Sequence, residues 1–562
     1  MMKNPSRKAI LTYAILVLAI LLLDLCFAYP SLHFSYEPQG ETVDLFSAYY
    51  SYSLNTEFDE ESLYFTQSGD DPQLYLTDME QTLGGITISL AEPLDSDMRV
   101  EVFYQTTEMP GLSARKSVVT TLYTGERSCN VKLPLHTYHS LRLDLDGSYQ
   151  LDSITGCSGT MKKTPVLNGA FFLVLLKWLP LSIPAVLLIF LAHRDRYQKT
   201  GTLVKSLFVL PENDTRNHGY DFLRVLAALM VISMHACRNA LAEMAMEGVG
   251  YHFVNILFLT ALSCNTLYMM LSGALLLQDR QETVLHFYAR RFGKVVIPLL
   301  CYYVLFLDFN QVFDDSLWDG IRVSLQMILS GAPGFAPQFW LVYTLIALYL
   351  FTPFLRKMLK ILNTQMLQTL VLLILILNLL TSYLPLLGIS FGVTSSLASW
   401  LGAYILGYFM TTKEAARNNR LYLHIGVFCL LLSILMAYTI PENIAYISNC
   451  VPTTLFICCA LFALVRSCEG FFAKPHRILG FFSRYSYSII LVHWYILFVV
   501  VESHLGITPT RARIFGGTLA TILLTFLLSA AYGFVFENLV ILPLQYVWNR
   551  FCGWVENRTK QA

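Results

Sequence analysis

The sequence has little charge and lacks several motifs of soluble enzymes. Only 14% of its 562 residues are charged, whereas a soluble globular domain carries about 25%. The formal net charge is zero and no long basic tract is present, so no nucleic-acid partner is expected. The twelve cysteines form no Cys-x-x-Cys pair, and neither a Walker A sequence nor a His-Glu-x-x-His sequence occurs. We therefore expect no zinc framework, no P-loop and no bound metal.

Apolar residues are abundant instead. They make up 55% of the chain, and the mean hydropathy of +0.51 predicts a polytopic α-helical membrane protein. The first apolar run, Ala9 to Ala28, follows three basic residues and is long enough to span a bilayer with its N-terminus in the cytoplasm. We assign residues 1–28 to a transmembrane anchor. Cleavage of a signal peptide after Ala28 is the alternative.

Residues 29–165 have a different pattern. Stretches such as GGITISLAEPL and MRVEVFYQT alternate apolar and polar residues between turn residues, which is typical of short, half-buried strands. This predicts an extracytoplasmic all-β sandwich inserted between two membrane spans. Cys129 and Cys157 would lie in an oxidising compartment, so we expect a disulfide, with two free thiols as the alternative. The segment LRLDLDGSYQLDSI resembles an edge of a jelly roll of the carbohydrate-binding kind. A role in binding a glycan is one hypothesis for this domain, and a plain spacer is the other.

The remainder of the chain is predicted to cross the membrane eleven times. Residues 166–192 form the second span, 193–216 a cytoplasmic linker, 217–548 a bundle of ten spans and 549–562 a cytoplasmic tail. About twelve spans result. Arginine and lysine recur in every second loop of the bundle, and the loops between them are mostly acidic. This alternation obeys the positive-inside rule and predicts a cytoplasmic C-terminus.

The segment YDFLRVLAALMVISMHACRNA, Tyr220 to Ala240, combines membrane hydropathy with Arg224 and His235. Eleven residues on a helix turn about 1100° and rise about 16 Å, so the two side chains share one face. Asp221 precedes Arg224 by three residues, within pairing distance. Ionisable groups inside a membrane are costly and mark functional sites. Structural roles are the alternative, with Arg224 reaching the headgroups and His235 bonded to a neighbouring helix.

Five segments, in order, resemble the acyltransferase-3 family of integral membrane acyltransferases between about residues 217 and 540. They are RVLAALMVISMH, with the arginine-x10-histidine motif, SGALLLQDRQETVLHFYARRFGKVVIP, FWLVYTLIALYLFTP, WLGAYILGYFM and SRYSYSIILVHWYILF. The sequence departs from the family pattern at Lys294, where arginine is common, and at Ile490, where tyrosine is common. Lysine keeps the charge but loses the bidentate guanidinium.

The resemblance implies an enzyme that moves an acyl group, commonly acetyl, from cytoplasmic acyl-CoA to a hydroxyl of an exported or lipid-linked glycan. It implies His235 as general base or covalent acyl carrier, and Arg224 as a donor-binding or orienting residue. Arg290, Arg291 and Lys294 would hold CoA phosphates, although the positive-inside signal also explains them. The supporting residues would be Asp221, Tyr268, His493 and Glu537. Ser272 and Gly273 are expected to allow close helix packing.

Two other functions fit the same features. A transporter of polysaccharide intermediates would also need polar groups inside the bundle, and a sensor would use the outer domain to bind sugar. Only the enzyme requires acyl-CoA and a basic histidine. A bacterial plasma membrane is the expected location, with lipid, acyl-CoA and a glycan as partners.

Overall fold

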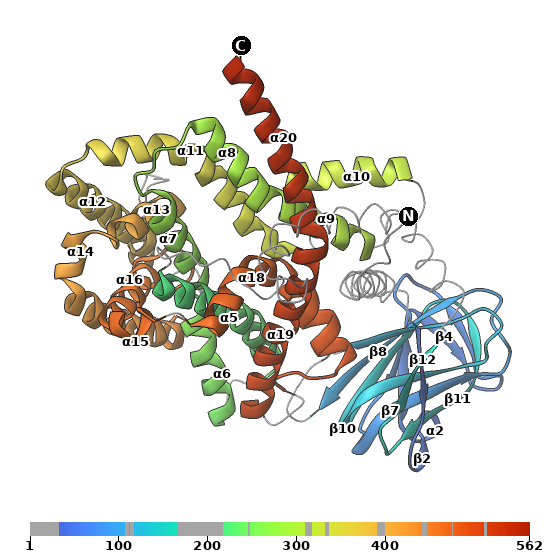
Figure 1. The fold of residues 1–562 in the computed structure, drawn as a ribbon. Coiled ribbons are helices and arrows are strands. Elements are labelled where there is room, and N and C mark those ends of the chain that lie inside the picture. The colour runs from blue at the N-terminus through green and yellow to red at the C-terminus, as the bar shows by residue number, and fades with distance from the viewer. Residues whose placement is uncertain are drawn as a thin grey trace, which may run out of the picture.

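The computed structural model describes residues 33–106, 112, 117–166, 217–244, 248–309, 317–331, 336–389, 399–440, 447–474, 476–510 and 514–561. It contains an all-β domain, in blue in Figure 1, and a helical bundle, in green to red. The predicted anchor at 1–28, nearly all of the second span at 166–192 and the linker at 193–216 lie outside the described residues.

The β domain runs from His33 to Val166 and confirms the all-β prediction. Its main sheet has the strand order β3-β6-β10-β7-β11-β5-β4, with β8 and β9 added at β10 and β2 at β11. The elements are β1 (His33–Glu37), β2 (Thr42–Asp44), α2 (Phe46–Tyr49), β3 (Tyr50–Leu54), β4 (Thr56–Asp59), β5 (Tyr64–Gln67), β6 (Gln73–Leu76), β7 (Gln81–Leu90), β8 (Met98–Thr106), β9 (Ser117–Leu122), β10 (Ser128–Leu145), β11 (Tyr149–Cys157) and β12 (Lys162–Val166).

The two ends of the β domain lie side by side. β1 pairs antiparallel with β12, and His33 lies opposite Val166. The chain therefore enters and leaves the domain at the same end. This geometry suits a domain inserted between two neighbouring spans, as the sequence predicts.

The disulfide prediction is wrong for this structure. Cys129 and Cys157 are both buried, free thiols. Cys129 on β10 lies opposite Ile88 of β7, and Cys157 on β11 lies opposite Gly85 on the other side of β7. The two cysteines are thus two strand spacings apart, about 10 Å, and are further offset by three residues along the strands. A disulfide requires Cα atoms within about 7 Å. Burial raises the pKa of the Cys129 thiol to about 12.

The ten apolar segments predicted as spans of the bundle are 220–240, 253–277, 295–307, 339–355, 362–384, 398–410, 421–438, 451–465, 481–501 and 515–547, and each contains a helix. The helices are α5 (His218–Glu243), α6 (Gly248–Ala261), α7 (Cys264–Leu276), α8 (Val284–Arg291), α9 (Ile297–Phe309), α10 (Leu317–Ser330), α11 (Trp340–Ile361), α12 (Thr364–Tyr383), α13 (Trp400–Phe409), α14 (Lys413–Arg417), α15 (Asn419–Thr439), α16 (Pro452–Ser467), α17 (Glu469–Phe472), α18 (Arg477–Tyr495), α19 (Ile514–Phe536) and α20 (Leu542–Gln561). Helical turns η3 (Phe292–Val296), η4 (Pro337–Phe339), η5 (Leu384–Leu387), η8 (Ile496–His504) and η9 (Glu537–Ile541) continue several of them.

Within the described residues, seven helical segments are long and apolar enough to cross a membrane. They are His218–Ala242, Gly248–Leu276, Pro337–Ile361, Thr364–Leu387, Asn419–Thr439, Arg477–His504 and Ile514–Val555. Two shorter apolar helices, Trp400–Phe409 and Pro452–Ser467, accompany them. α10 lies between the predicted spans at 295–307 and 339–355, where the sequence predicts a loop, and α20 continues as a helix through the predicted boundary at residue 548.

The basic loops gather at one end of the bundle. Arg356, near the C-terminal end of α11, pairs with Glu282 before α8 at 2.7 Å, and Gln278 donates to Thr411 at 2.7 Å. Arg466 donates to the carbonyl of Met410. The start of α20 joins the same end, because the indole of Trp548 donates to the carbonyl of Ala289 at 2.8 Å. This clustering agrees with the alternation of basic loops in the sequence.

α7 and α13 pack with their backbones in contact. A Cβ atom added at Gly273 would lie 1.8 Å from the carbonyl oxygen of Tyr404, and one added at Gly407 would lie 1.9 Å from that of Met270. Glycine at these positions allows the close approach that membrane helices use in place of hydrophobic driving force. The expected packing role of Gly273 is confirmed.

We expect Glu282→Gln to destabilise the bundle, because the side chains of Glu282 and Arg356 are only 12% and 9% exposed. Removing one partner of a buried pair costs roughly 3–5 kcal/mol. Burial alone would raise the pKa of Glu282, but the hydrogen bond and charge of Arg356 lower it below the ordinary value of 4.5. The pair therefore stabilises the fold above about pH 4.5, and this contribution is lost as the pH falls through the lowered pKa.

Thermal unfolding in lipid nanodiscs, measured from about pH 7 to pH 3, checks this. The variant should melt several degrees lower at neutral pH and should converge with the wild type in acid. Asp279→Asn is the matched control, since its partner Lys360 and Asp279 itself are 66% and 62% exposed and exposed pairs contribute little. Equal effects of the two substitutions would contradict the role of the buried pair.

Candidate functional site

Arg224 is held by a small polar network where α5 begins. The side chain of Asn217 caps the helix by accepting from the backbone N–H of Tyr220 at 3.1 Å. One turn later Arg224 Nη1 lies 3.3 Å from Asp221 Oδ1 and 3.4 Å from the hydroxyl of Ser483 on α18. Ser483 donates to the same Asp221 oxygen at 2.6 Å. The predicted pairing of Asp221 with Arg224 is therefore present, and it fixes the guanidinium against a second helix.

A cavity of about 720 Å³ opens beside Arg224. It lies between α5, α7, α8, α11, α18 and the π-helical turns η3 and η9. In the part of the chain that the structure describes, six cationic side chains line it, and Glu537 is the one carboxylate among the lining residues. The cations are Arg224, Arg280, Arg290, Arg291, Lys294 and Arg484. Tyr268 and Tyr349 contribute aromatic walls. Such an excess of positive charge suits a ligand that carries several negative charges.

Two guanidinium nitrogens in this cavity are buried without a hydrogen-bond partner among the described residues. They are Nε of Arg291 and Nη1 of Arg484. Arg291 lies 5.6 Å above the ring of Phe287, which orients the group. A buried donor without a partner loses its water without compensation. Phosphate oxygens would satisfy both groups by charge-assisted hydrogen bonds, so these residues fit a phosphorylated ligand.

A pair of histidines lies beyond the cavity wall. The rings of His235 on α5 and His493 on α18 have centroids 5.3 Å apart, and the indole of Trp494 contacts His235 edge-on at 5.0 Å. His493 is fully buried. Its Nδ1 bonds to the carbonyl of Ile490 at 2.7 Å, and its Nε2 is buried with no hydrogen-bond partner among the described residues. Because Ile490 lines the cavity, the pair lies about one helical turn from it.

The structure brings most of the predicted site residues together. Those lining the cavity are Arg224, Tyr268, Arg290, Arg291, Lys294 and Glu537. Asp221 lies behind Arg224, and His235 does not itself line the cavity. Glu537 accepts a hydrogen bond from Ser488 of α18 at 3.3 Å. Lys294 lies among the cavity cations although it replaces an arginine in the pattern.

The sequence analysis missed Arg484, Ser483 and Gln338. Arg484 and Ser483 begin the segment SRYSYSIILVHWYILF, but only His493 and the position of Ile490 in that segment are singled out from the sequence. Gln338 donates to the carbonyl of Leu491 at 2.9 Å, and its Oε1 has no hydrogen-bond partner in the described residues. The available signal is a glutamine directly before the apolar run that begins at Phe339.

A Gly-x-Ser-x-Gly spacing occurs at Gly388-Ile389-Ser390-Phe391-Gly392. A serine nucleophile in this motif needs a strand before it and a helix after it. Here the helical turn η5 precedes Gly388, which has a φ of +72°. Residues 390–398 lie outside the described part. The segment therefore gives no support for a serine nucleophile.

The arrangement combines a cationic cavity, able to bind phosphates, with a histidine pair about one turn away, able to accept and return a proton. A family model described as an acyltransferase domain matches residues 217–530, which is more than half of the chain. No curated protein matches the chain.

Proposed function

Since the chain belongs to the acyltransferase-3 family of membrane acyltransferases, we propose that it is an O-acyltransferase that uses acyl-CoA, with acetyl as the acyl group. The acceptor is a hydroxyl of an extracytoplasmic or lipid-linked glycan, and the enzyme resides in a bacterial plasma membrane. The observation that supports this most is the cationic cavity beside the histidine pair. The donor carries phosphates, and the reaction requires a base.

In the proposed reaction CoA phosphates bind Arg291, Arg484 and their neighbours, and the thioester extends past Ile490 toward His235. The acceptor hydroxyl donates its proton to His235 while its oxygen attacks the thioester carbonyl carbon. The carbon–sulfur bond then breaks, the sulfur leaves with the electron pair, and the proton from His235 completes the CoA thiol. A glycan ester and free CoA result. In the covalent alternative, the acyl group first rests on a His235 nitrogen.

Purified protein in nanodiscs with radiolabelled acetyl-CoA tests the proposal. Thioester loss should accelerate when a panel of envelope glycans is added, and label should appear in the glycan. Binding of acetyl-CoA without any glycan-dependent loss of thioester would contradict glycan acylation. Absence of acetyl-CoA binding by folded protein would contradict the donor.

His493→Gln should lower kcat by about 10²-fold and leave KM for acetyl-CoA nearly unchanged. The expected reason is positional, since His493 contacts His235 and loss of about 1 Å of alignment can cost that factor. The pH profile of kcat should also shift, because the ring facing the base is replaced by an amide. His252→Gln is the matched control, as His252 is an exposed histidine bonded to Tyr438 at 2.8 Å. A variant that lost only thermal stability would indicate a packing role for His493.

A further inference from the structure

One face of the β domain carries a row of aromatic and charged side chains that crosses five strands. Tyr52 of β3 lies opposite Tyr75 of β6, and Tyr75 lies opposite Arg142 of β10. Arg142 then lies opposite Phe103 of β8, and Phe103 opposite Ser117 of β9. Four strand spacings separate the ends of this row, which is about 19 Å long. This length can accommodate several linked sugar rings.

The aromatic ring at one end of the row, that of Tyr52, is accessible. Tyr52 is 45% exposed, and its ring stacks on that of Tyr75 with centroids 4.5 Å apart and planes inclined by 16°. Stacking holds the Tyr52 ring in a fixed plane and leaves part of its surface open. The apolar C–H face of a sugar ring fits such a platform, because an aromatic ring offers a large rigid surface at low entropic cost.

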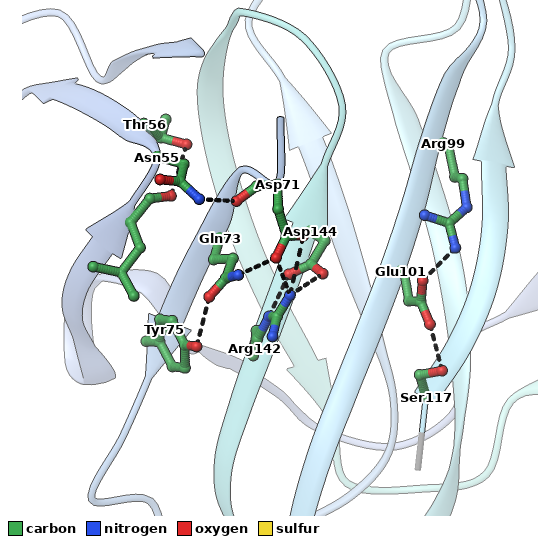
Figure 2. A network of polar contacts seen from close by, with 11 residues as sticks. Asn55, Thr56, Asp71, Gln73, Tyr75, Arg99, Glu101, Ser117, Arg142 and Asp144 are labelled. Atoms are coloured by element: carbon green, nitrogen blue, oxygen red, sulfur yellow. Dashed lines mark hydrogen bonds and ion pairs between the residues drawn. The ribbon is translucent and has the colours of Figure 1, made fainter. Parts of the chain in front are cut away.

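Polar groups beside the platform form a connected network, which Figure 2 shows in detail. Arg142 holds Asp144 through two hydrogen bonds, at 2.7 and 2.6 Å, and reaches Asp71 at 3.1 Å. Gln73 joins Asp71 to Tyr75, whose hydroxyl donates to Gln73 Oε1 at 2.7 Å. These contacts hold several side-chain hydrogen-bond donors and acceptors in fixed positions on one face of the sheet, as recognition of sugar hydroxyls requires.

Two buried carboxylates lie beneath the exposed side chains of this face. Asp144 and Glu101 are only 6% and 8% exposed, yet they lie directly opposite one another on β10 and β8. Like charges in this position destabilise a sheet, and Arg99 and Arg142 are needed to compensate them. Burial raises the pKa of Asp144 despite its hydrogen bonds from Arg142. Well-packed apolar residues would stabilise a sheet at least as well, so stability alone does not explain this composition.

We infer that this face binds an uncharged oligosaccharide that runs across the strands from Tyr52 toward Ser117. The charges support a neutral ligand, since two arginines, 99 and 142, face three carboxylates, those of Asp71, Glu101 and Asp144. A polyanionic glycan or an anionic membrane would meet net negative charge. In one respect the inference rests on the proposed function, because the bound glycan is taken to be the acceptor that the membrane domain acylates.

Saturation-transfer NMR on the full chain in nanodiscs tests the site without acetyl-CoA. The probes are cellotetraose, maltotetraose, laminaritetraose and chitotetraose, with tetragalacturonate as the anionic comparison. At least one neutral probe should bind, and Tyr52→Ala should weaken that binding about tenfold or more. Tyr64→Ala is the matched control, because Tyr64 lies on β5 and is 41% exposed. The Tyr64→Ala variant should bind the neutral probe as tightly as the wild type does.

Several results would overturn the inference. They are binding of none of the neutral probes, preference for the anionic probe, or equal effects of the two tyrosine substitutions. The outcome is separable from that of the proposed function. If the protein binds an oligosaccharide but transfers no acyl group, the binding site on the β domain is supported and the proposed acyltransferase activity is contradicted. If it transfers acyl groups but binds no oligosaccharide, only the binding site is contradicted.

Discussion

Replacing His235 by alanine should lower kcat for acyl transfer by about 10²–10⁴-fold, the contribution of a well-placed general base. A sugar hydroxyl is a weak nucleophile near neutral pH, and His235 is the imidazole that the arginine-x10-histidine segment places on α5. His493 and Trp494 hold the ring on two sides. The substitution leaves Arg224 and the cavity cations in place, so affinity for acetyl-CoA should be unchanged. Stopped-flow turnover and isothermal titration on the same nanodisc sample separate these two effects.

His252→Ala provides the control for loss of a histidine elsewhere in the bundle. It should retain wild-type turnover. Unchanged turnover in His235→Ala would show that His235 is neither the general base nor the acyl carrier. A parallel fall in donor affinity and turnover would instead point to a collapsed cavity. If His235 carries the acyl group covalently, wild-type protein that is incubated with labelled acetyl-CoA and quenched before the acceptor is added should contain labelled acetyl on His235.

Replacing Arg291 by alanine should raise KM for acetyl-CoA by roughly 10-fold to 100-fold, with a smaller change in kcat. Its Nε is buried in the cavity wall and lacks a hydrogen-bond partner in the described part of the chain, and hydrogen bonds to charged groups contribute about 1.5–3 kcal/mol. Donor affinity should also fall as salt is added, because ions screen charge–charge attraction.

An acyl donor without phosphates tests whether Arg291 acts by binding phosphate. With acetyl-pantetheine, wild type and Arg291→Ala should have the same KM, since no phosphate remains for Arg291 to bind. Arg420→Ala is the control, because Arg420 is exposed and does not line the cavity. A penalty that persists with acetyl-pantetheine would show that Arg291 supports the fold or the thioester and does not bind phosphate.

Much of the bundle could be predicted because its signals are local. Apolar length predicts helices, and basic loops predict which helix ends lie together. The three-residue spacing of Asp221 and Arg224 predicts their contact. Part of the cationic cavity could be predicted from the cluster of Arg290, Arg291 and Lys294, which the structure places on α8 and η3. The approach of Arg484 of α18 to this cluster depends on tertiary packing between segments nearly two hundred residues apart.

Other features depend on geometry that sequence patterns do not specify. The disulfide prediction considered only the compartment and the number of cysteines, whereas the register of β10 and β11 on either side of β7 keeps Cys129 and Cys157 apart. α10 was missed because Asp319 and Arg322 interrupt a short apolar pattern. The contact between the two histidines, and the row from Tyr52 to Ser117, arise only when separate elements pack or pair.

The most direct test of the central proposal is mass spectrometry of glycans after incubation with the protein in nanodiscs and ¹³C-acetyl-CoA. The proposal predicts ester-linked ¹³C-acetyl groups on an envelope glycan, formed with wild type and lost with His235→Ala while the donor still binds. A folded protein that binds no acetyl-CoA, or that passes glycans across the membrane without labelling them, would contradict it.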